Sequence, residues 1–132
     1  SSTNAASNAH EDDPKVCPKC HMPLQTSNLY SAKLIHENKV HYFDDIGCMI
    51  LWTKEKDILL KNNAQVFTRD TQKYINADKA QYKINDTTPM MYGFSAYETQ
   101  ENDQIAFDEV ILRMLRGENM TNPKIRKQLL KN

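Results

Sequence analysis

Two thiols, an imidazole and a thioether lie within the seven-residue segment CPKCHMP, which spans residues 17–23. Thiolates, thioethers and imidazoles are the donors that select Cu(I), whereas a thioether contributes little to a zinc site. Pro18 and Pro23 restrict the backbone, so a turn can hold these side chains on one side without a helix beneath them. The segment therefore predicts a soft-metal site with Cu(I) as the favoured ion. Its candidate ligands are Cys17, Cys20, His21 and Met22.

A structural zinc site is one alternative interpretation of the same segment. The chain contains three cysteines, an odd number that cannot close into a complete disulfide framework. A Cys-x-x-Cys pair needs two more ligands to close around zinc, and Cys48, His36 and His41 are the candidates that remain. Cys48 falls in a predicted helix, which favours a buried and inert thiol, and the alternation around His41 places it on the solvent-facing side of a strand. A small zinc-binding interaction module remains open.

Covalent haem attachment is a second alternative. Cys17, Cys20 and His21 match the Cys-x-x-Cys-His pattern, and Met90 or Met91 would supply an axial ligand. The protein would then be a c-type electron-transfer protein. A proline two residues after the histidine disfavours the helix that usually carries this pattern. A metal-free redox pair fits less well, because the usual strand before the motif and helix after it are missing.

The elements that must position the first segment are a hairpin and a helix. Apolar runs predict two short strands over residues 32–35 and 40–43. Asp44 or Asp45 offers an N-cap, and the apolar stripe that follows predicts a helix from Ile46 to about Leu60.

The second half of the chain repeats this pattern. FDEVILRML, which starts at Phe107, aligns with FDDIGCMIL, which starts at Phe43. Strands are expected over residues 92–97 and 105–107, followed by a helix capped by Asp108. The aligned apolar pairs are Phe43 with Phe107, Ile46 with Val110, Ile50 with Met114, and Leu51 with Leu115. Their helical spacing favours a duplicated strand-strand-helix unit, hence an α+β fold of two similar units packed together.

Met90 and Met91 precede the first strand of the second half, as residues 17–22 precede that of the first. If the halves pack about a pseudo-twofold axis, the two segments meet. Cys20 and Met22 from one side and Met90 or Met91 from the other would then supply a two- or three-coordinate Cu(I) site.

The 132 residues fit one domain, with residues 1–13 as a disordered tether and residues 14–132 as the domain. The two halves cover about residues 14–70 and 71–118, and a polar tail carries a short helix from Pro123 to Leu130. Lys+Arg and Asp+Glu both number 17, so the charge balance argues against a nucleic-acid partner. The longest apolar run, residues 46–52, is too short to span a membrane.

Taken in order along the chain, several strings resemble the NosL family, the copper-binding accessory proteins of nitrous oxide reductase assembly. The resemblance covers residues 16 to about 110. It is carried by the Cys20-x-Met22 motif, by YFDDIGCMILW from Tyr42, by VFTRD and INADKA between Val66 and Ala80, and by TPMMYGF and FDEV between Thr88 and Val110.

The resemblance implies a fold related to the organomercurial lyase core and Cu(I) binding through Cys20, Met22 and Met90. His21 and Met91 stand where the family pattern has glycine, so each adds a possible donor. It also implies a non-enzymatic copper chaperone that serves denitrification by delivering Cu(I) to nitrous oxide reductase or its membrane maturation complex. The family is periplasmic or lies on the outer face of the cell envelope, often lipid-anchored. Ser1 would then directly follow the lipid-bearing cysteine of the precursor.

Overall fold

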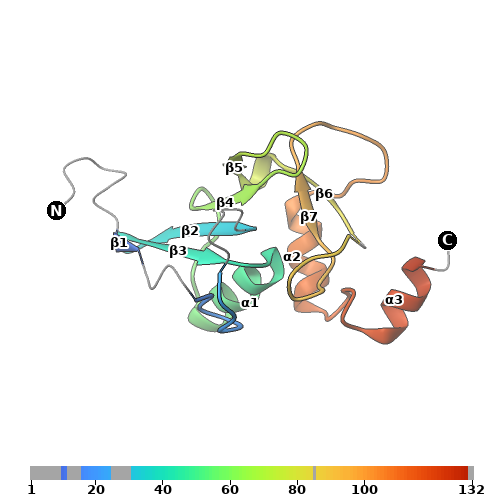
Figure 1. Cartoon of the computed structure of the whole chain (residues 1–132), viewed down its shortest axis with the longest axis horizontal. Helices are drawn as coiled ribbons and strands as arrows, with labels where there is room; N and C mark the ends of the chain where they lie inside the picture. Colours follow the sequence, from blue (N-terminus) through green and yellow to red (C-terminus); the bar gives the residue numbers. More distant parts are fainter. Residues whose placement is uncertain (1–9, 12–15, 25–30, 85, 131–132) are drawn as a thin grey trace.

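The computed structural model describes residues 10–11, 16–24, 31–84 and 86–130 and shows a mixed α+β fold (Figure 1). A five-stranded sheet has the strand order β1-β3-β2-β4-β5, and a two-stranded sheet pairs β6 with β7. The pairing is antiparallel except between β1 and β3. The strands are β1 (His10–Glu11), β2 (Ala32–His36), β3 (Lys39–Phe43), β4 (Ala64–Phe67), β5 (Tyr74–Asn76), β6 (Gln81–Lys83) and β7 (Ser95–Tyr97).

The β2–β3 hairpin confirms the two strands predicted in the first half. Glu37 and Asn38 both have positive φ, 50° and 63°, as a two-residue turn that matches the twist of a hairpin requires. Alternate residues of each strand face the core. His41 is buried and its ring lies 4.8 Å from that of Trp52, so the expectation of a solvent-facing His41 is wrong.

Helix α1 (Ile46–Lys56) begins where the sequence predicts. Asp45 is its N-cap and accepts a hydrogen bond from the Gly47 N–H at 3.1 Å. The helix ends four residues before the predicted Leu60, because Asp57 adopts a left-handed conformation and donates its N–H to Lys54 and Thr53 carbonyls. Aspartate tolerates this conformation better than most side chains, so a polar residue ends the helix without a glycine.

The second half contains a 3-10 turn, η1 (Ala77–Lys79), and helices α2 (Phe107–Leu115) and α3 (Pro123–Leu130). The short helix predicted in the tail is confirmed. The strand predicted over residues 105–107 is reduced to a bridge between Ile105 and Tyr82. Asp108 lies in the first turn of α2 and is not its cap, since the N-cap is Ala106 without a side-chain bond. Phe107 is drawn into the helix start because its ring stacks on that of Tyr82, 5.5 Å away.

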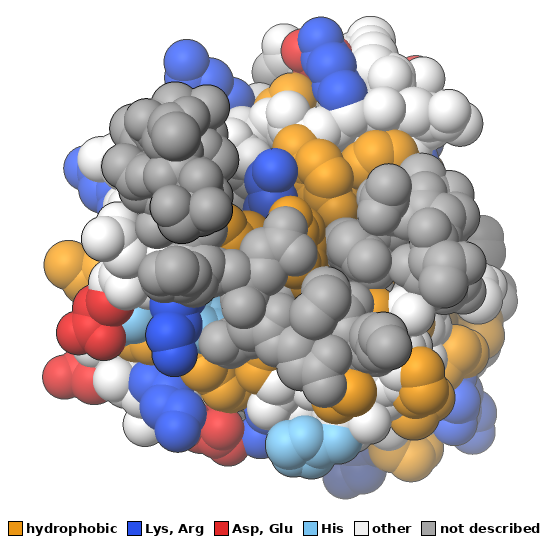
Figure 2. Space-filling view, turned by 60° about the vertical axis from the view of Figure 1, so that its left-hand side comes forward, with side chains coloured by type: hydrophobic (Ala, Val, Ile, Leu, Met, Phe, Trp, Pro, Cys, Tyr) orange, Lys and Arg blue, Asp and Glu red, His pale blue; other side chains and the backbone are white. Residues whose placement is uncertain are grey.

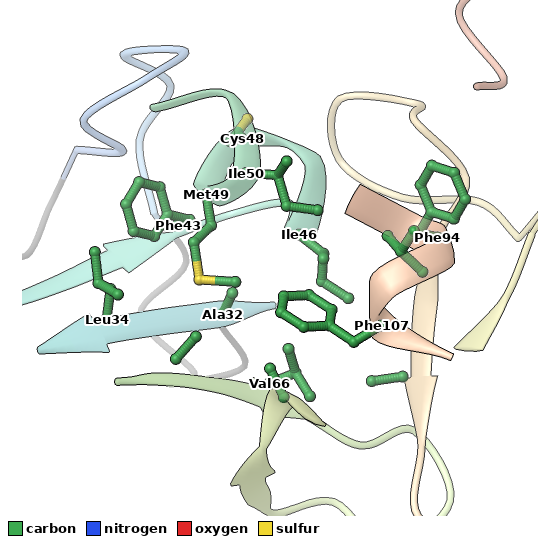
Figure 3. Close-up of a cluster of buried hydrophobic side chains, with 14 of the residues drawn as sticks. Ala32, Leu34, Phe43, Ile46, Cys48, Met49, Ile50, Val66, Phe94 and Phe107 are labelled. Carbon is green, nitrogen blue, oxygen red and sulfur yellow. The ribbon is translucent and has the colours of Figure 1, made fainter. Parts of the chain in front are cut away.

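The two sheets and both long helices enclose one core (Figure 3). Helix α1 packs on β2 and β3 and against α2, and the strands β4 and β7 lie side by side. Of the aligned pairs, Phe43 and Phe107, Ile46 and Val110, and Ile50 and Met114 are all buried, whereas Leu115 is 44% exposed. Phe43 ends a strand while Phe107 begins a helix, so the aligned strings occupy different local structure.

The chain ends are placed only in part. Most of the tether predicted over residues 1–13 lies outside the described residues, but His10–Glu11 pair in parallel with β3 and so belong to the sheet. No helix among the described residues is long and apolar enough to cross a membrane. On the face shown in Figure 2, basic and acidic side chains lie beside one another, as the balanced charge leads one to expect.

Candidate metal centre

A tight turn over residues 17–22, called here the cysteine turn, carries the Cys-x-x-Cys motif. The Cys17 N–H donates to the Met22 carbonyl at 3.0 Å, and the His21 N–H donates to the Cys17 carbonyl at 2.9 Å. Val16 and Pro23 form an antiparallel bridge at its base. His21 has a φ of 64°, the left-handed conformation that favours glycine. The turn thus holds its shape with few residues and no helix, as the two prolines predict.

Backbone N–H groups point at both sulfur atoms of this turn. Those of Lys19 and Cys20 donate to the Cys17 sulfur, and that of Met22 donates to the Cys20 sulfur. N–H groups directed at sulfur stabilise a thiolate over a thiol. Since the thiolate is the form that binds a metal, these backbone donors favour coordination at both sulfurs, although burial and the Asp44 bond outweigh them at Cys20.

The junction between β3 and α1 provides the other side of the site. Asp44 directly follows β3, and Cys48 lies in the first turn of α1. The three cysteine sulfurs and one oxygen of the Asp44 carboxylate all lie within 4.8 Å of one another. We call Cys17, Cys20, Asp44 and Cys48 the cysteine cluster. Four donors at this spacing are a group that can bind a metal ion.

The cysteine cluster is largely shielded from solvent. Cys17 and Cys48 are fully buried and Asp44 is 8% exposed, whereas Cys20 is half-buried. Figure 3 shows Cys48 and Met49 on opposite sides of α1, with Met49 directed at the sheet. Cys48 is thus a buried member of the core whose sulfur lies beside those of the cysteine turn. Cys20 is thus the most accessible of the three thiols.

Hydrogen bonds give the three thiols different acidities. The Cys48 thiol donates to the Cys17 sulfur, which lowers the pKa of Cys17 to about 6 and raises the pKa of Cys48. The Cys20 thiol donates to the two Asp44 oxygens at 3.2 and 3.3 Å. Burial first, and then this bond, raise the pKa of Cys20 to about 12. Among the three thiols, Cys17 is therefore the most acidic.

A loop of the second half, residues 88–93, lies against the same end of α1. We call it the methionine loop. The Asp45 carboxylate accepts hydrogen bonds from the Thr88 hydroxyl at 2.6 Å and from the Met90 N–H at 2.9 Å. Tyr92 packs over Gly47 so closely that an added Cβ would lie 2.5 Å from its ring. The methionine loop and the cysteine cluster therefore meet at adjacent residues, Asp45 and Asp44.

The residues predicted as ligands fall into two sets. Cys17 and Cys20 belong to the cysteine cluster, whereas His21 and Met22 are exposed, with Met22 at 47%. Met22 and Asp44 both line a cavity of about 440 Å³ that opens beside the cluster. In the methionine loop, Met90 is partly buried against the core, and Met91 is 49% exposed with a φ of 62°.

Two members of the cluster were not predicted as leading ligands. Cys48 is buried as predicted, and its sulfur lies in the cluster with that of Cys17, which favours the ligand role that the zinc alternative gave it. Asp44 was considered only as a helix cap, a role that Asp45 fills. The available signal was the Asp44-x-x-x-Cys48 spacing across the helix start, which directs a carboxylate and a thiol to one side of that end.

No family model, curated protein or solved structure matches this chain. The chemistry of the cysteine cluster is then the basis for its function. Three sulfurs and a carboxylate in mostly buried surroundings form a group that can hold a metal ion.

Proposed function

We propose that this protein is a Cu(I) metallochaperone. The observation that carries the proposal is the convergence of three thiols from two separate segments in the cysteine cluster. Thiolate sulfur is the donor class that selects Cu(I) over harder cations, and Cu(I) needs only two or three such donors. The chain acts in this proposal as a carrier and not as an enzyme.

The cluster suits an ion that must be held firmly and then released. Cys17 is the most acidic of the three thiols and lies in the buried part of the site, so it gives up its proton to a metal ion most readily. Cys20 is half-buried and is hydrogen-bonded to Asp44, which lines the same cavity as Met22, so an incoming donor has access from this side. A receiving protein can then displace the ligands one at a time, with Met22 as a thioether that binds Cu(I) during entry and exit.

The NosL resemblance supports nitrous oxide reductase, or its membrane maturation complex, as the recipient. It also supports a relation of the fold to the organomercurial lyase core and a location in the periplasm or on the outer face of the envelope, with a lipid anchor. Met90 is the family-matched ligand in the methionine loop, and its backbone is fixed to Asp45 beside the cluster. These assignments are part of the proposal.

Covalent haem fits the geometry less well than copper does. Both cysteines of the pattern would have to reach the edge of one haem, yet Cys17 is fully buried and its sulfur accepts a hydrogen bond from the Cys48 thiol. His21, the expected iron ligand, is exposed to solvent, whereas the Cys17 sulfur is buried. A protein purified from an exporting host should therefore show no covalently bound haem by intact mass.

Competition titration tests the proposal directly. Reduced protein should withdraw one equivalent of Cu(I) from a chromophoric chelator under anaerobic conditions. Cys17→Ser, Cys20→Ser and Cys48→Ser should each weaken binding by more than about tenfold, since even loss of an outer-shell partner costs that much. Met120→Leu, a volume-conserving change outside the cluster, is the matched control. Parent-like affinity in Cys20→Ser would overturn the proposal.

Delivery needs a separate assay. Cu(I)-loaded protein is mixed with copper-free nitrous oxide reductase, and the two are separated and analysed for metal. Transfer that is faster than from a free Cu(I) chelate of equal affinity is the expected result. Equal rates from both sources would contradict a chaperone role even if the binding site is real.

A further inference from the structure

We infer that the cysteine cluster is also a four-coordinate site for a divalent cation of the zinc class, in which Asp44 is the fourth ligand. The inference concerns a second ion for the same pocket and does not depend on copper delivery. It rests on the Asp44 carboxylate, which lies among the three thiols. Cu(I) prefers sulfur and imidazole donors and binds a carboxylate oxygen weakly.

The donor set matches what zinc binds in proteins. Zn²⁺ is held tetrahedrally by thiolate sulfur at about 2.3 Å and carboxylate oxygen at about 2.0–2.2 Å. Those bond lengths place neighbouring sulfurs about 3.8 Å apart around the ion. The four donor atoms already lie within 4.8 Å of one another, and Cys20 and Asp44 lie 3.2 Å apart. Small side-chain movements therefore suffice to close the site.

Asp44 is placed for coordination by its surroundings. Its backbone carbonyl accepts a bond from the Ser31 hydroxyl at 2.8 Å, which fixes the main chain. Its carboxylate accepts a hydrogen bond from the Cys20 thiol. A thiol is a weak hydrogen-bond donor, so a metal ion readily takes the place of its proton. The neighbouring Asp45 takes the helix-capping role, so Asp44 is not needed there.

Charge and access favour the same conclusion. A doubly charged cation compensates buried thiolates and a carboxylate better than a singly charged one, which matters where solvent is excluded. Asp44 also lines the cavity of about 440 Å³, so the fourth ligand lies on the side from which an ion enters. With Asp44 bound, the site is closed, and a divalent ion would exclude Cu(I) until it is displaced.

Substitution of Asp44 should affect the affinities for the two ions differently. A tetrahedral divalent ion loses one of its four ligands when Asp44 is changed, whereas a three-coordinate Cu(I) ion keeps all of its sulfurs. Asp44→Asn should therefore weaken divalent binding by more than about tenfold. It should weaken Cu(I) binding by a clearly smaller factor, because Asp44 is then only a hydrogen-bond partner of Cys20 and not a ligand. Asp103→Asn, an exposed aspartate away from the cluster, is the matched control.

Co²⁺ is the probe, because its absorption reports both thiolate bonding and coordination number. Reduced parent protein should show thiolate-to-cobalt charge transfer and the intense visible bands of tetrahedral Co²⁺, and Zn²⁺ should abolish both. Absence of these bands in the parent would overturn the inference and leave the copper proposal standing if Cu(I) still titrates. Equal loss of Co²⁺ and Cu(I) in Asp44→Asn would also overturn it, because Asp44 would then act through Cys20.

X-ray absorption of the zinc-loaded parent protein keeps the test independent of any variant that fails to fold. A first shell of three sulfurs and one oxygen is the expected result. A shell without oxygen, or with fewer than three sulfurs, would contradict the assignment of Asp44 and of the cluster.

Discussion

His21 occupies a backbone conformation that costs an L-residue about 1–2 kcal/mol, with a φ of 64°. The cysteine turn requires it, because the His21 N–H must reach the Cys17 carbonyl. His21→Gly should relieve this strain and raise the free energy of unfolding. Part of the gain is offset by the entropy that glycine adds to the unfolded chain, so a net increase of about 0.5–1 kcal/mol is expected. Urea unfolding of the metal-free protein measures it.

His21→Ala is the control for this prediction, since it removes the imidazole but retains the Cβ that causes the strain. It should not stabilise the protein. The imidazole is outside the cysteine cluster, so both variants should bind Cu(I) as the parent does in the competition titration. A matching loss of affinity in both would show instead that His21 is a ligand.

Thr88 connects the methionine loop to the start of α1. Its buried hydroxyl donates to the Asp45 carboxylate and accepts the Gly93 N–H at 3.1 Å. Thr88→Val keeps the shape of the side chain and removes both bonds. Because it leaves buried polar groups without partners, the free energy of unfolding should fall by about 1–3 kcal/mol in urea titration.

Thr87→Val is the matched control, since Thr87 is exposed and its side chain bonds to none of these groups. It should change stability by less than about 0.5 kcal/mol. Equal effects of the two substitutions would show that the Asp45 bonds do not secure the methionine loop.

Gly47 lets the methionine loop lie directly on α1. An added Cβ would meet the Tyr92 ring at 2.5 Å and the Met114 side chain at 2.9 Å. Gly47→Ala gains up to about 1 kcal/mol in helix propensity, but overpacking costs about 1–3 kcal/mol. A net loss of stability of about 1 kcal/mol is therefore expected in thermal or urea unfolding.

A double-mutant cycle identifies the ring as the cause. In a Tyr92→Ala background, Gly47→Ala should become neutral or stabilising, because the space that the Cβ needs is then free. An unchanged cost in that background would point to another source of strain, such as a displaced Met114.

Across the whole fold, local pattern predicted most of the elements and the Cys17 and Cys20 half of the site, but it did not predict that Asp44 and Cys48 complete the cluster. The apolar alternation and the turn at Glu37 and Asn38 define a hairpin locally, and Asp45 caps α1 through a residue two positions away. The cysteine cluster is different, because Cys20 and Asp44 are 24 residues apart in the chain. Only the packing of the cysteine turn on the β3–α1 junction brings them together, and no periodicity in the sequence reports that packing.

The predicted end of α1 and the predicted start of α2 differ from the structure for a related reason. Asp57 and Phe107 follow local patterns that allow more than one outcome, and a local cap decides at Asp57 whereas a tertiary contact decides at Phe107. Ile58 donates its N–H to the Thr53 carbonyl, which closes α1 early. Phe107 stacks on Tyr82, which draws residues predicted as a strand into a helix.

Asp70 joins the two sheets through its carboxylate. One oxygen accepts the Glu98 N–H at 3.0 Å, and the other accepts the Thr99 N–H at 2.8 Å. These residues follow β7, whereas Asp70 lies in the turn between β4 and β5. Burial acts to raise the pKa of Asp70, but the N–H donors outweigh it and lower the pKa to about 2.

The lowered pKa of Asp70 makes the free energy of unfolding depend on pH in the acidic range. An unfolded aspartate has a pKa near 3.8, so the folded state binds protons less readily, and the stabilisation is complete above that pH. It is lost as the pH falls toward about 2, where the folded carboxylate protonates.

Asp70→Asn should lower the free energy of unfolding by about 1 kcal/mol at neutral pH, a value reduced for solvent screening at this exposed group. The difference from the parent should shrink between about pH 4 and pH 2 in urea unfolding followed by circular dichroism. Asp103→Asn should show no such trend, and a constant difference for Asp70→Asn across this range would mean that ionised Asp70 does not hold the sheets together.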